Sequence, residues 1–419
     1  MHRAPLSGGA GSSHKRRPRH EVADVFRRYG DDYRRSRRLP FSHLKVMRAV
    51  EQCRTAVLGG HIERCDACGH ERVAYNSCRN RHCPKCQALA KAAWLEARRS
   101  ELLPVPYFHN VFTIPHELNP LALRNKKVVY DILFAAASET LQTFAADAKR
   151  GLDGRLGFTA VLHTWDQRLR LHLHLHCVIA GGALSPDSKQ WTNARRNFLF
   201  PVKALSKVFR GKFISRLRTA FVAAELTFPG RIAPRATEKE FAQLLGRLRE
   251  KNWVVYSKAP FAGPEKVLDY LGRYTHRVAI ANHRIADVGG EHVTFHYRDR
   301  ADGNRRKRCT VTAEEFIRRF LLHVLPKSYC RIRHFGFLAS RAKGRGLARC
   351  RELLGLPPEI PKPPERSTGE RMLELTGVDL TRCPCCQNGT MHLVADLPPV
   401  HPVTSISGGR APPRVQEAS

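Results

Sequence analysis

Three histidines alternate with three leucines in the run LHLHLH at residues 171–176. Side chains at positions i and i+2 of a β-strand lie on one face, so the run predicts a strand whose leucines enter a core and whose histidines face a site. Same-face neighbours are roughly 6.6 Å apart along a strand. Two neighbouring histidines can therefore share an ion, whereas His172 and His176 are too far apart to do so easily. His174 belongs to either pair.

A metal ion is the chemistry that this pattern favours, because imidazole is a common metal ligand. The pair His174 and His176 needs a third ligand, for which His163 on the preceding predicted strand, His172 and an acidic residue are candidates. Imidazoles alone do not identify the ion. If the ion acts on a phosphate, we expect Mg²⁺ or Mn²⁺ in an open site rather than a closed zinc cage.

Two tyrosines, Tyr270 and Tyr274, stand four residues apart in the segment VLDYLGRYTHR. On a helix they share one face. Apolar residues lie on roughly the same stripe, and a tyrosine in such a stripe is more often part of a core than a catalyst. The alternative is attack by a phenol on a phosphodiester, because neighbouring cations can stabilise the developing charge. The cations in this segment are Arg273, His276 and Arg277.

A phenol has a pKa of about 10 and needs help to act as a nucleophile at neutral pH. A metal ion that polarises the scissile phosphate supplies such help. Attack would leave a phosphotyrosyl link to one DNA end and a free hydroxyl on the other. Because the bond energy is kept, the same step can run backwards and rejoin strands without ATP.

Paired cysteines fill the segment CDACGHERVAYNSCRNRHCPKC at residues 65–86. The N-terminus has no apolar secretory signal, so we expect a reducing cytosol, where thirteen cysteines favour metal over disulfides. Two CxxC pairs predict one zinc-ribbon-like site in which four thiolates bind a structural zinc ion. The predicted ligands are Cys65, Cys68, Cys83 and Cys86, with Cys78 and His82 as additional candidates.

A second cysteine fragment, CPCC at residues 383–386, offers half a zinc site through Cys383 and Cys386. The candidate partners are His392, Cys350 and Cys330, and the alternative is that the fragment binds no metal. Only half of the usual ligand set is evident in the sequence.

The charge of the chain favours a polyanionic partner. Lys and Arg number 72 against 37 Asp and Glu, a formal net charge of +35. Such a surface repels itself, whereas nucleic acid would neutralise it and release counterions. The basic and aromatic run RIRHFGF at residues 331–337 could stack unpaired bases or form an ordinary strand with a basic outer face. No apolar run approaches the length of a membrane span.

The helices and strands that must position these residues are predicted from hydrophobic periodicity and from the residues that typically end such elements. We expect helices over most of 21–60, at 121–149, at 203–226 and at 238–250, and strands around FTIP, LGFTAVLHTW and the histidine run. Thr312 and Glu315 form a capping-box signature for the next helix. Strands interleaved with helices, some joined by short turns, indicate an α+β domain on an antiparallel sheet.

Four segments follow from composition and motifs. Residues 1–20 are predicted to be a disordered basic tail, 21–103 a helical and zinc-binding domain, and 104–355 the catalytic domain. Residues 356–419 are predicted to be a Pro-rich, mostly disordered tail that carries the half zinc site.

Several long segments in order resemble the HUH-type rolling-circle transposases of the insertion sequence 91 family. The resemblance covers most of residues 20–350 and runs through the cysteine segment, LHTWDQRLRLHLHLHCVIAGG, YLGRYTHRVAIANHRI and EEFIRRFLLHVLPKSYCRIRHFGFLA. It implies a Rep-like HUH endonuclease domain, an antiparallel sheet with flanking helices and a central histidine strand, after a small helical and zinc-ribbon-like module. The two-histidine signature matches His174 and His176, although Leu171 and Leu173 replace two positions of a His-His-Pro-His-type run.

The resemblance also implies an activity. A nucleophile at Tyr270 or Tyr274 would nick and rejoin single-stranded DNA through a 5′-phosphotyrosine, at element ends and target site, in rolling-circle-type transposition. The expected location is the bacterial cytoplasm, at the nucleoid. The expected DNA-binding residues are Arg273, Arg277, Thr113, Arg331 and Arg333. The alternatives are a rolling-circle replication initiator and a non-catalytic zinc protein that binds DNA.

Overall fold

The computed structural model describes residues 18–149, 151–195, 197–258, 266–267, 272 and 279–400. The chain divides into two compact units. The larger unit contains residues 1–51 and 79–379, and the smaller one contains residues 52–78 and 380–419. The predicted domain boundaries after residues 103 and 355 stay predictions. Tyr270 and Tyr274, with Arg273, His276 and Arg277, lie outside the described residues.

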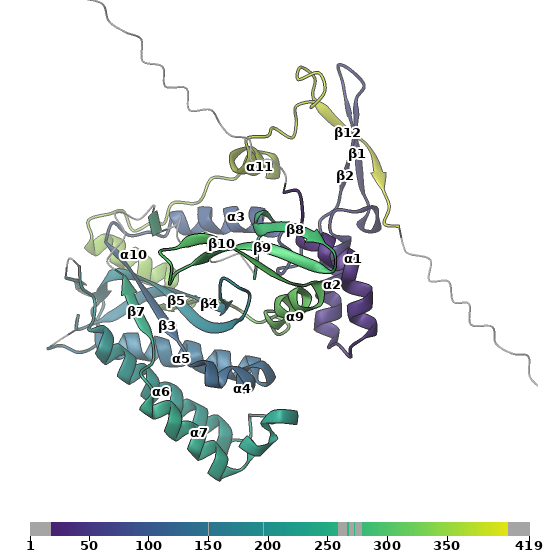
Figure 1. Ribbon diagram of the computed structural model, residues 1–419. Helices are drawn as coiled ribbons and strands as arrows, with labels where there is room; N and C mark the ends of the chain where they lie inside the picture. Colours follow the sequence, from purple (N-terminus) through teal and green to yellow (C-terminus); the bar gives the residue numbers. More distant parts are fainter. Residues whose placement is uncertain are drawn as a thin grey trace, which may run out of the picture. The chain divides into compact units, whose positions relative to one another are not determined.

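A six-stranded antiparallel sheet forms the centre of the larger unit (Figure 1). Its order is β11 (Ile332–Gly336), β4 (Arg155–Trp165), β5 (Leu171–Leu184), β3 (Tyr107–Thr113) and β7 (Val255–Lys258), and β6 (Trp191–Asn193) pairs with the end of β5. The predicted α+β arrangement on an antiparallel sheet is thus confirmed. The histidine run lies on β5, which has β4 and β3 as neighbours.

One face of this sheet forms the main core against α5 (Lys126–Ala145) and α6 (Val202–Val222), with α7 (Glu238–Glu250) packed beyond (Figure 1). Leu173 and Leu175 of β5 enter this core, as the alternation predicts. Full burial of one such side chain stabilises the fold by about 1.5–3 kcal/mol. The leucines of the run therefore fix which face of β5 the histidines occupy.

The helix predicted at 121–149 is divided at Asn125 into α4 (Asn119–Arg124) and α5. The backbone of Asn125 is non-helical, at φ −121° and ψ 44°. Its side-chain amide donates to the carbonyl oxygen of Thr227 at 2.8 Å and its Oδ1 accepts from the Thr227 amide at 2.7 Å. These hydrogen bonds across the fold outweigh the helical pattern of the local sequence.

The other face of the sheet carries the histidines and is covered by α3 (Gln87–Arg99) and α10 (Lys343–Leu353). A second buried cluster packs there, including Val161 of β4 and Val178 of β5. Val267, from the described part of the tyrosine segment, belongs to the same cluster. We call this surface the histidine face.

A second sheet in the larger unit has the order β10 (Arg305–Thr312), β9 (His292–Asp299) and β8 (Ile285–Gly289). Helices α1 (Val22–Arg35), α2 (Phe41–Gln52) and α9 (Ala313–Leu322) belong to the same unit, and the rings of Phe26 and Phe320 meet edge to face at 5.3 Å. Thr312 caps α9 as predicted, accepting a hydrogen bond from the Glu315 amide at 3.2 Å. Short 3₁₀ helices complete the described elements at Ala56–Leu58, His116–Leu118, Gly230–Ala236 and Asn282–Arg284.

The smaller unit is a three-stranded antiparallel sheet in the order β12 (Met391–Leu397), β1 (Gly60–Cys65) and β2 (Glu71–Tyr75). Its outer strand β12 comes from the segment predicted to be mostly disordered, which also forms α11 (Thr368–Thr376). β12 is ordered because it pairs with β1 from Cys65 opposite Met391 to Gly60 opposite Leu397. A single-sequence pattern cannot reveal a partner so far away in the chain.

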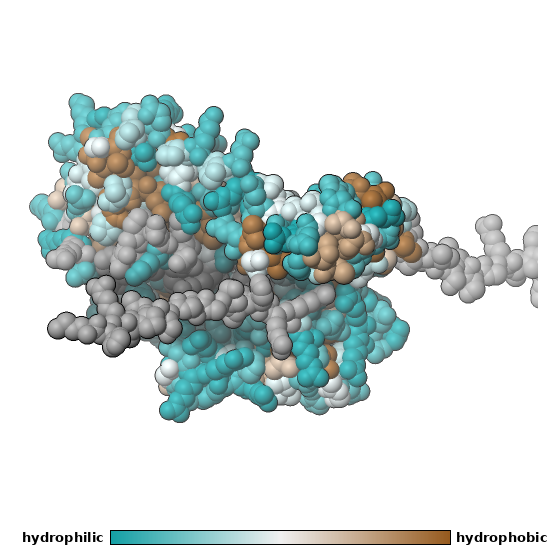
Figure 2. Space-filling view, turned by 90° about the horizontal axis from the view of Figure 1, so that it is seen from above, coloured by the Kyte–Doolittle hydropathy of each residue, from teal (hydrophilic) through white to brown (hydrophobic). Residues whose placement is uncertain are grey.

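Within the described ranges, each helix is too short or too polar to span a membrane. The coloured part of the space-filling view shows many hydrophilic residues beside smaller hydrophobic patches (Figure 2).

Candidate active site and metal centres

Three buried histidines meet on the histidine face. One ring nitrogen each of His163, His174 and His176 lies within 4.8 Å of the others. His163 of β4 is directly opposite His174 of β5, and the His163 and His176 ring centroids are 4.4 Å apart. His172 is exposed at the start of β5 and is not part of the group. A neighbouring strand approaches more closely than the next same-face residue of one strand, which explains why His163 completes the set.

Burial keeps His174 and His176 in the neutral form that binds metal. Desolvation is the main cause that lowers the pKa of His174 and of His176 well below the ordinary value, and the charge of His163 adds to it. Nδ1 of His174 lies 2.9 Å from the carbonyl oxygen of His172. A carbonyl only accepts, so Nδ1 of His174 carries the proton and Nε2 keeps its lone pair for an ion.

His109 orients the third imidazole. Its Nε2 lies 2.9 Å from Nδ1 of His176, and the two rings are stacked. Burial lowers the pKa of His109 to about 4, with a smaller effect of Lys258, so His109 is neutral at pH 7. When His176 donates from Nδ1 to His109, its Nε2 faces the ion, an arrangement common behind metal-binding histidines. Sequence reasoning missed His109; the only available signal was its position in a predicted strand.

An aromatic side chain contacts the histidine group, and a cationic side chain lies within electrostatic range of it. The ring of Trp165 stacks on His163 with centroids 4.7 Å apart. Arg300, exposed in the turn between β9 and β10, is close enough that its charge lowers the pKa of His172, His174 and His176, although burial is the larger cause for each. The group therefore lies in a positive field, which suits a phosphate.

The described flanks of the tyrosine segment lie against the same face. Val267 is fully buried with Val161 and Val178, which are same-face neighbours of His163 and His176 on their strands. Gly272 approaches α3 so closely that a Cβ there would lie 2.8 Å from the Lys91 side chain. Val267 and Gly272, both among the described residues, thus lie on the histidine face.

The predicted DNA-binding residues have different environments. Thr113 lies on β3 directly opposite His174. Arg331 is buried, and burial lowers its pKa to about 10. Arg333 forms an ion pair with Asp131 at 2.6 Å and lies over the ring of Phe134. Burial and this ion pair place Arg331 and Arg333 in the packing of the larger unit rather than on an open basic surface.

Eight of the thirteen cysteines, all among the described residues, form two groups of four, and neither group is the predicted set of zinc ligands. Cys65 and Cys68 group with Cys383 and Cys386, whereas Cys83 and Cys86 group with two other cysteines. In each group the sulfur atoms lie within 4.8 Å of one another. Two consecutive CxxC pairs can bind different ions because each pair supplies only half of a tetrahedral site.

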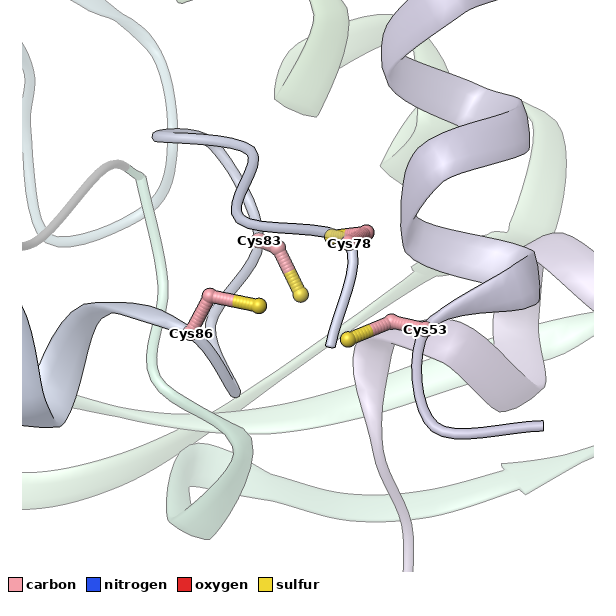
Figure 3. A group of neighbouring side chains, drawn as sticks. All are labelled: Cys53, Cys78, Cys83 and Cys86. Atoms are coloured by element: carbon pink, nitrogen blue, oxygen red, sulfur yellow. The ribbon is translucent and has the colours of Figure 1, made fainter. Parts of the chain in front are cut away.

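The second of these groups consists of Cys53, Cys78, Cys83 and Cys86, whose sulfurs point toward a common centre (Figure 3). Cys78 was predicted as an additional ligand, whereas Cys53 lacks the paired spacing that would have revealed it. His82 is not part of the group. Its Nε2 accepts a hydrogen bond from the Leu325 amide at 3.2 Å. Four thiolates in this arrangement suit zinc.

Two family models and two relatives match the chain. A family model described as "Transposase zinc-binding domain" matches residues 25–114, and one described as "Putative transposase" matches residues 157–345. The chain is 51% identical over 376 residues to "Putative transposase y4qJ" of Sinorhizobium fredii, covering 88% of this chain and 94% of the relative. It is 29% identical over 317 residues to the transposase for insertion sequence element IS801 of Pseudomonas savastanoi pv. phaseolicola, covering 74% of each chain. The chain therefore belongs to the insertion sequence 91 family of transposases and carries that family's zinc-binding domain in its N-terminal part.

Proposed function

We propose that this transposase nicks and rejoins single-stranded DNA through a covalent phosphotyrosine intermediate, in rolling-circle-type transposition. Membership of a transposase family implies cleavage and transfer of DNA strands. The observation that carries the finer proposal is the buried group His163, His174 and His176 on the face where Val267 of the tyrosine segment is buried.

A Rep-like HUH fold is part of this proposal. In that arrangement the histidine strand is central in an antiparallel sheet, with helices on both sides. The order β11-β4-β5-β3-β7 places β5 in the middle of five strands, and the helices α5 and α3 cover its opposite faces.

The histidine group fits a divalent cation. The imidazoles of His163, His174 and His176 would hold it, and nitrogen donors suit Mn²⁺ better than Mg²⁺, which prefers oxygen. A bound cation of this kind polarises a phosphate oxygen and stabilises the charge that develops there. His109 keeps His176 in the tautomer that leaves Nε2 facing the cation.

The nucleophile in this proposal is the phenol oxygen of Tyr270 or Tyr274. It forms a bond to phosphorus while the bond from phosphorus to the 3′ oxygen breaks. The phenol proton leaves to solvent and the departing 3′ oxygen takes up a proton, so one strand ends in a 3′-hydroxyl and the other in a 5′-phosphotyrosine. Attack by a 3′-hydroxyl on the same link reverses the step and joins strands.

Cations position the DNA in this proposal. Arg273 and Arg277 neighbour the tyrosines in sequence, and the charge of Arg300 acts on the histidine group. The net charge of +35 supplies sequence-independent affinity for a DNA backbone and for the nucleoid. Thr113, opposite His174 in the sheet, would contact the strand near the reacting phosphate.

The test is capture of the covalent intermediate. The purified full chain is incubated with a labelled single-stranded oligonucleotide that carries an element end, with Mn²⁺ or with chelator, and separated under denaturing conditions. We expect an Mn²⁺-dependent adduct that is lost in Tyr270→Phe with Tyr274→Phe. Tyr75→Phe, an exposed tyrosine of the smaller unit, is the matched control and should retain it.

Two outcomes would overturn the proposal. An adduct that persists in the double variant places the nucleophile elsewhere; Tyr256, exposed on β7, is then the next residue to substitute. Absence of an adduct in the wild type, with DNA binding intact, supports a DNA-binding protein without strand-transfer chemistry.

A further inference from the structure

We propose that Cys65, Cys68, Cys383 and Cys386 bind a second structural zinc ion, which joins the C-terminal segment to the β1–β2 hairpin. The matched zinc-binding domain ends at residue 114, so it does not include Cys383 and Cys386. All four cysteines belong to the smaller unit. The proposal concerns the architecture of that unit and does not depend on the strand-transfer chemistry.

The sulfur positions match a tetrahedral zinc site. Sγ of Cys65 lies 3.7 Å from Sγ of Cys386, and Sγ of Cys68 lies 3.7 Å from Sγ of Cys383. Four thiolates at about 2.3 Å from a central zinc ion are about 3.8 Å from one another. A disulfide would require about 2.05 Å. The cysteines are therefore spaced for an ion rather than for cross-links.

The two CxxC segments form the same turn. The Gly69 amide donates to the carbonyl oxygen of Cys65 at 3.1 Å, and the Gln387 amide donates to that of Cys383 at 3.2 Å. Gly69 and Gln387 both have a positive φ, +70° and +61°. Each of the two equivalent turns presents a pair of sulfurs, so the two turns together form one closed site.

Backbone amides stabilise the C-terminal sulfurs as thiolates. The Cys385 amide donates to Sγ of Cys383 at 3.3 Å, and the Gly389 amide donates to Sγ of Cys386 at 3.4 Å. Hydrogen bonds to the charged form of a metal ligand orient it and favour it.

A glycine permits the two turns to approach. A Cβ at Gly389 would lie 2.3 Å from Sγ of Cys65 and 2.7 Å from Oδ1 of Asp66. Oδ1 of Asp66 also accepts a hydrogen bond from the Thr390 amide at 2.8 Å. Gly389 thus leaves room for the turn at Cys65, and Asp66 binds the backbone next to Gly389, although the two turns are more than three hundred positions apart.

The smaller unit has almost no apolar core of its own. Among its described residues the buried hydrophobic side chains are Cys53, Cys65, Cys383 and Met391. A unit of this size cannot build a sufficient apolar core, and small domains of this kind fold on binding metal. Pairing of β12 with β1 should therefore depend on the ion.

The earlier candidates for partners of Cys383 and Cys386 have other roles. Cys330 donates from Sγ to the carbonyl oxygen of Ile332, and Cys350 is buried in the cluster of the histidine face. His392 lies 3.3 Å from Asp66. Cys385, between the two ligands, is exposed and is not in the group, so it provides a matched control.

The first experiment counts zinc in the purified full chain and in serine variants. We expect Cys383→Ser with Cys386→Ser to lose one equivalent of zinc, and Cys65→Ser with Cys68→Ser to lose one equivalent. The variant with all four substitutions should lose the same single equivalent, because the pairs share one ion. Cys385→Ser should lose none. An unchanged zinc content after substitution of Cys383 and Cys386, or a loss of two equivalents in the fourfold variant, overturns the proposal.

The second experiment uses only the wild-type chain and does not depend on the folding of variants. Cysteines are alkylated with and without a zinc chelator, and the peptide that spans residues 383–386 is analysed by mass spectrometry. Cys383 and Cys386 should be protected until zinc is removed, whereas Cys385 in the same peptide should react throughout. Equal reaction of all three cysteines in the zinc-loaded protein overturns the proposal.

Discussion

Nε2 of His109 lies 2.9 Å from Nδ1 of His176, with the two rings nearly parallel and their centroids 5.2 Å apart. His109 lies on β3 and His176 lies on β5. In the register of these strands His109 is directly opposite Val178, and His176 is directly opposite Val111. The contact is therefore a diagonal one between same-face residues of neighbouring strands. It lets one histidine set the tautomer of another.

Substitution of His109 tests this role. His109→Ala should raise the Mn²⁺ concentration that gives half-maximal adduct formation by about 10–100-fold. This is the usual loss of metal affinity when the residue that orients a ligand is removed. At saturating Mn²⁺ the rate should return toward that of the wild type. His116→Ala, at an exposed position, is the control. A rate deficit that no Mn²⁺ concentration repairs would contradict a role in orienting the ligand.

The choice of third ligand is a separate prediction. His163→Ala should reduce Mn²⁺-dependent adduct formation by about 100-fold or more, because loss of a direct ligand costs more than loss of its orienting partner. His172→Ala should stay close to the wild type, since His172 is exposed and outside the group. Metal titrations of both variants provide the measurement. The opposite ranking would show that the ion binds to the pair His172 and His174.

Stability should depend on pH through buried neutral histidines such as His323. Burial is the main cause that lowers the pKa of His323 from 6.5 to about 4, so the unfolded chain binds its proton at a higher pH than the folded chain. Stability is then greatest above pH 6.5 and falls as the pH drops toward 4, by about 3 kcal/mol for this group. Urea denaturation of the wild type and of His323→Gln should show a weaker pH dependence in the variant. Equal slopes would contradict the shift.

Arg300 should act on DNA affinity rather than on folding. Arg300→Ala removes an exposed charge that acts on the histidine group. It should reduce the slope of the logarithm of the single-strand binding constant against the logarithm of the salt concentration by about 0.7, the value for one phosphate contact. Arg333→Ala, which breaks the ion pair with Asp131, should instead lower the thermal midpoint. Fluorescence anisotropy at several salt concentrations and thermal melts separate the two effects. An unchanged slope for Arg300→Ala would contradict its contact with phosphate.

Several features of this protein were determined by the sequence alone. The alternation of leucine and histidine predicts β5 and its two faces, and the leucines are found in the main core. Thr312 and Glu315 predict the start of α9. The family segments were sufficient to indicate a transposase of the insertion sequence 91 family, which the comparisons confirm. Each of these signals is local, because strand periodicity and helix caps depend on neighbours a few positions away.

Only the tertiary structure decided which distant residues meet. His163 joins His174 because β4 and β5 pair in a register that places them opposite each other. Cys65 and Cys68 meet Cys383 and Cys386 because β12 pairs with β1, although the nearer pair Cys83 and Cys86 has the spacing of a partner. A ligand pair in a sequence specifies half of a site. The other half depends on strand register and chain packing, which are set by contacts over the whole fold and leave no trace in the local pattern.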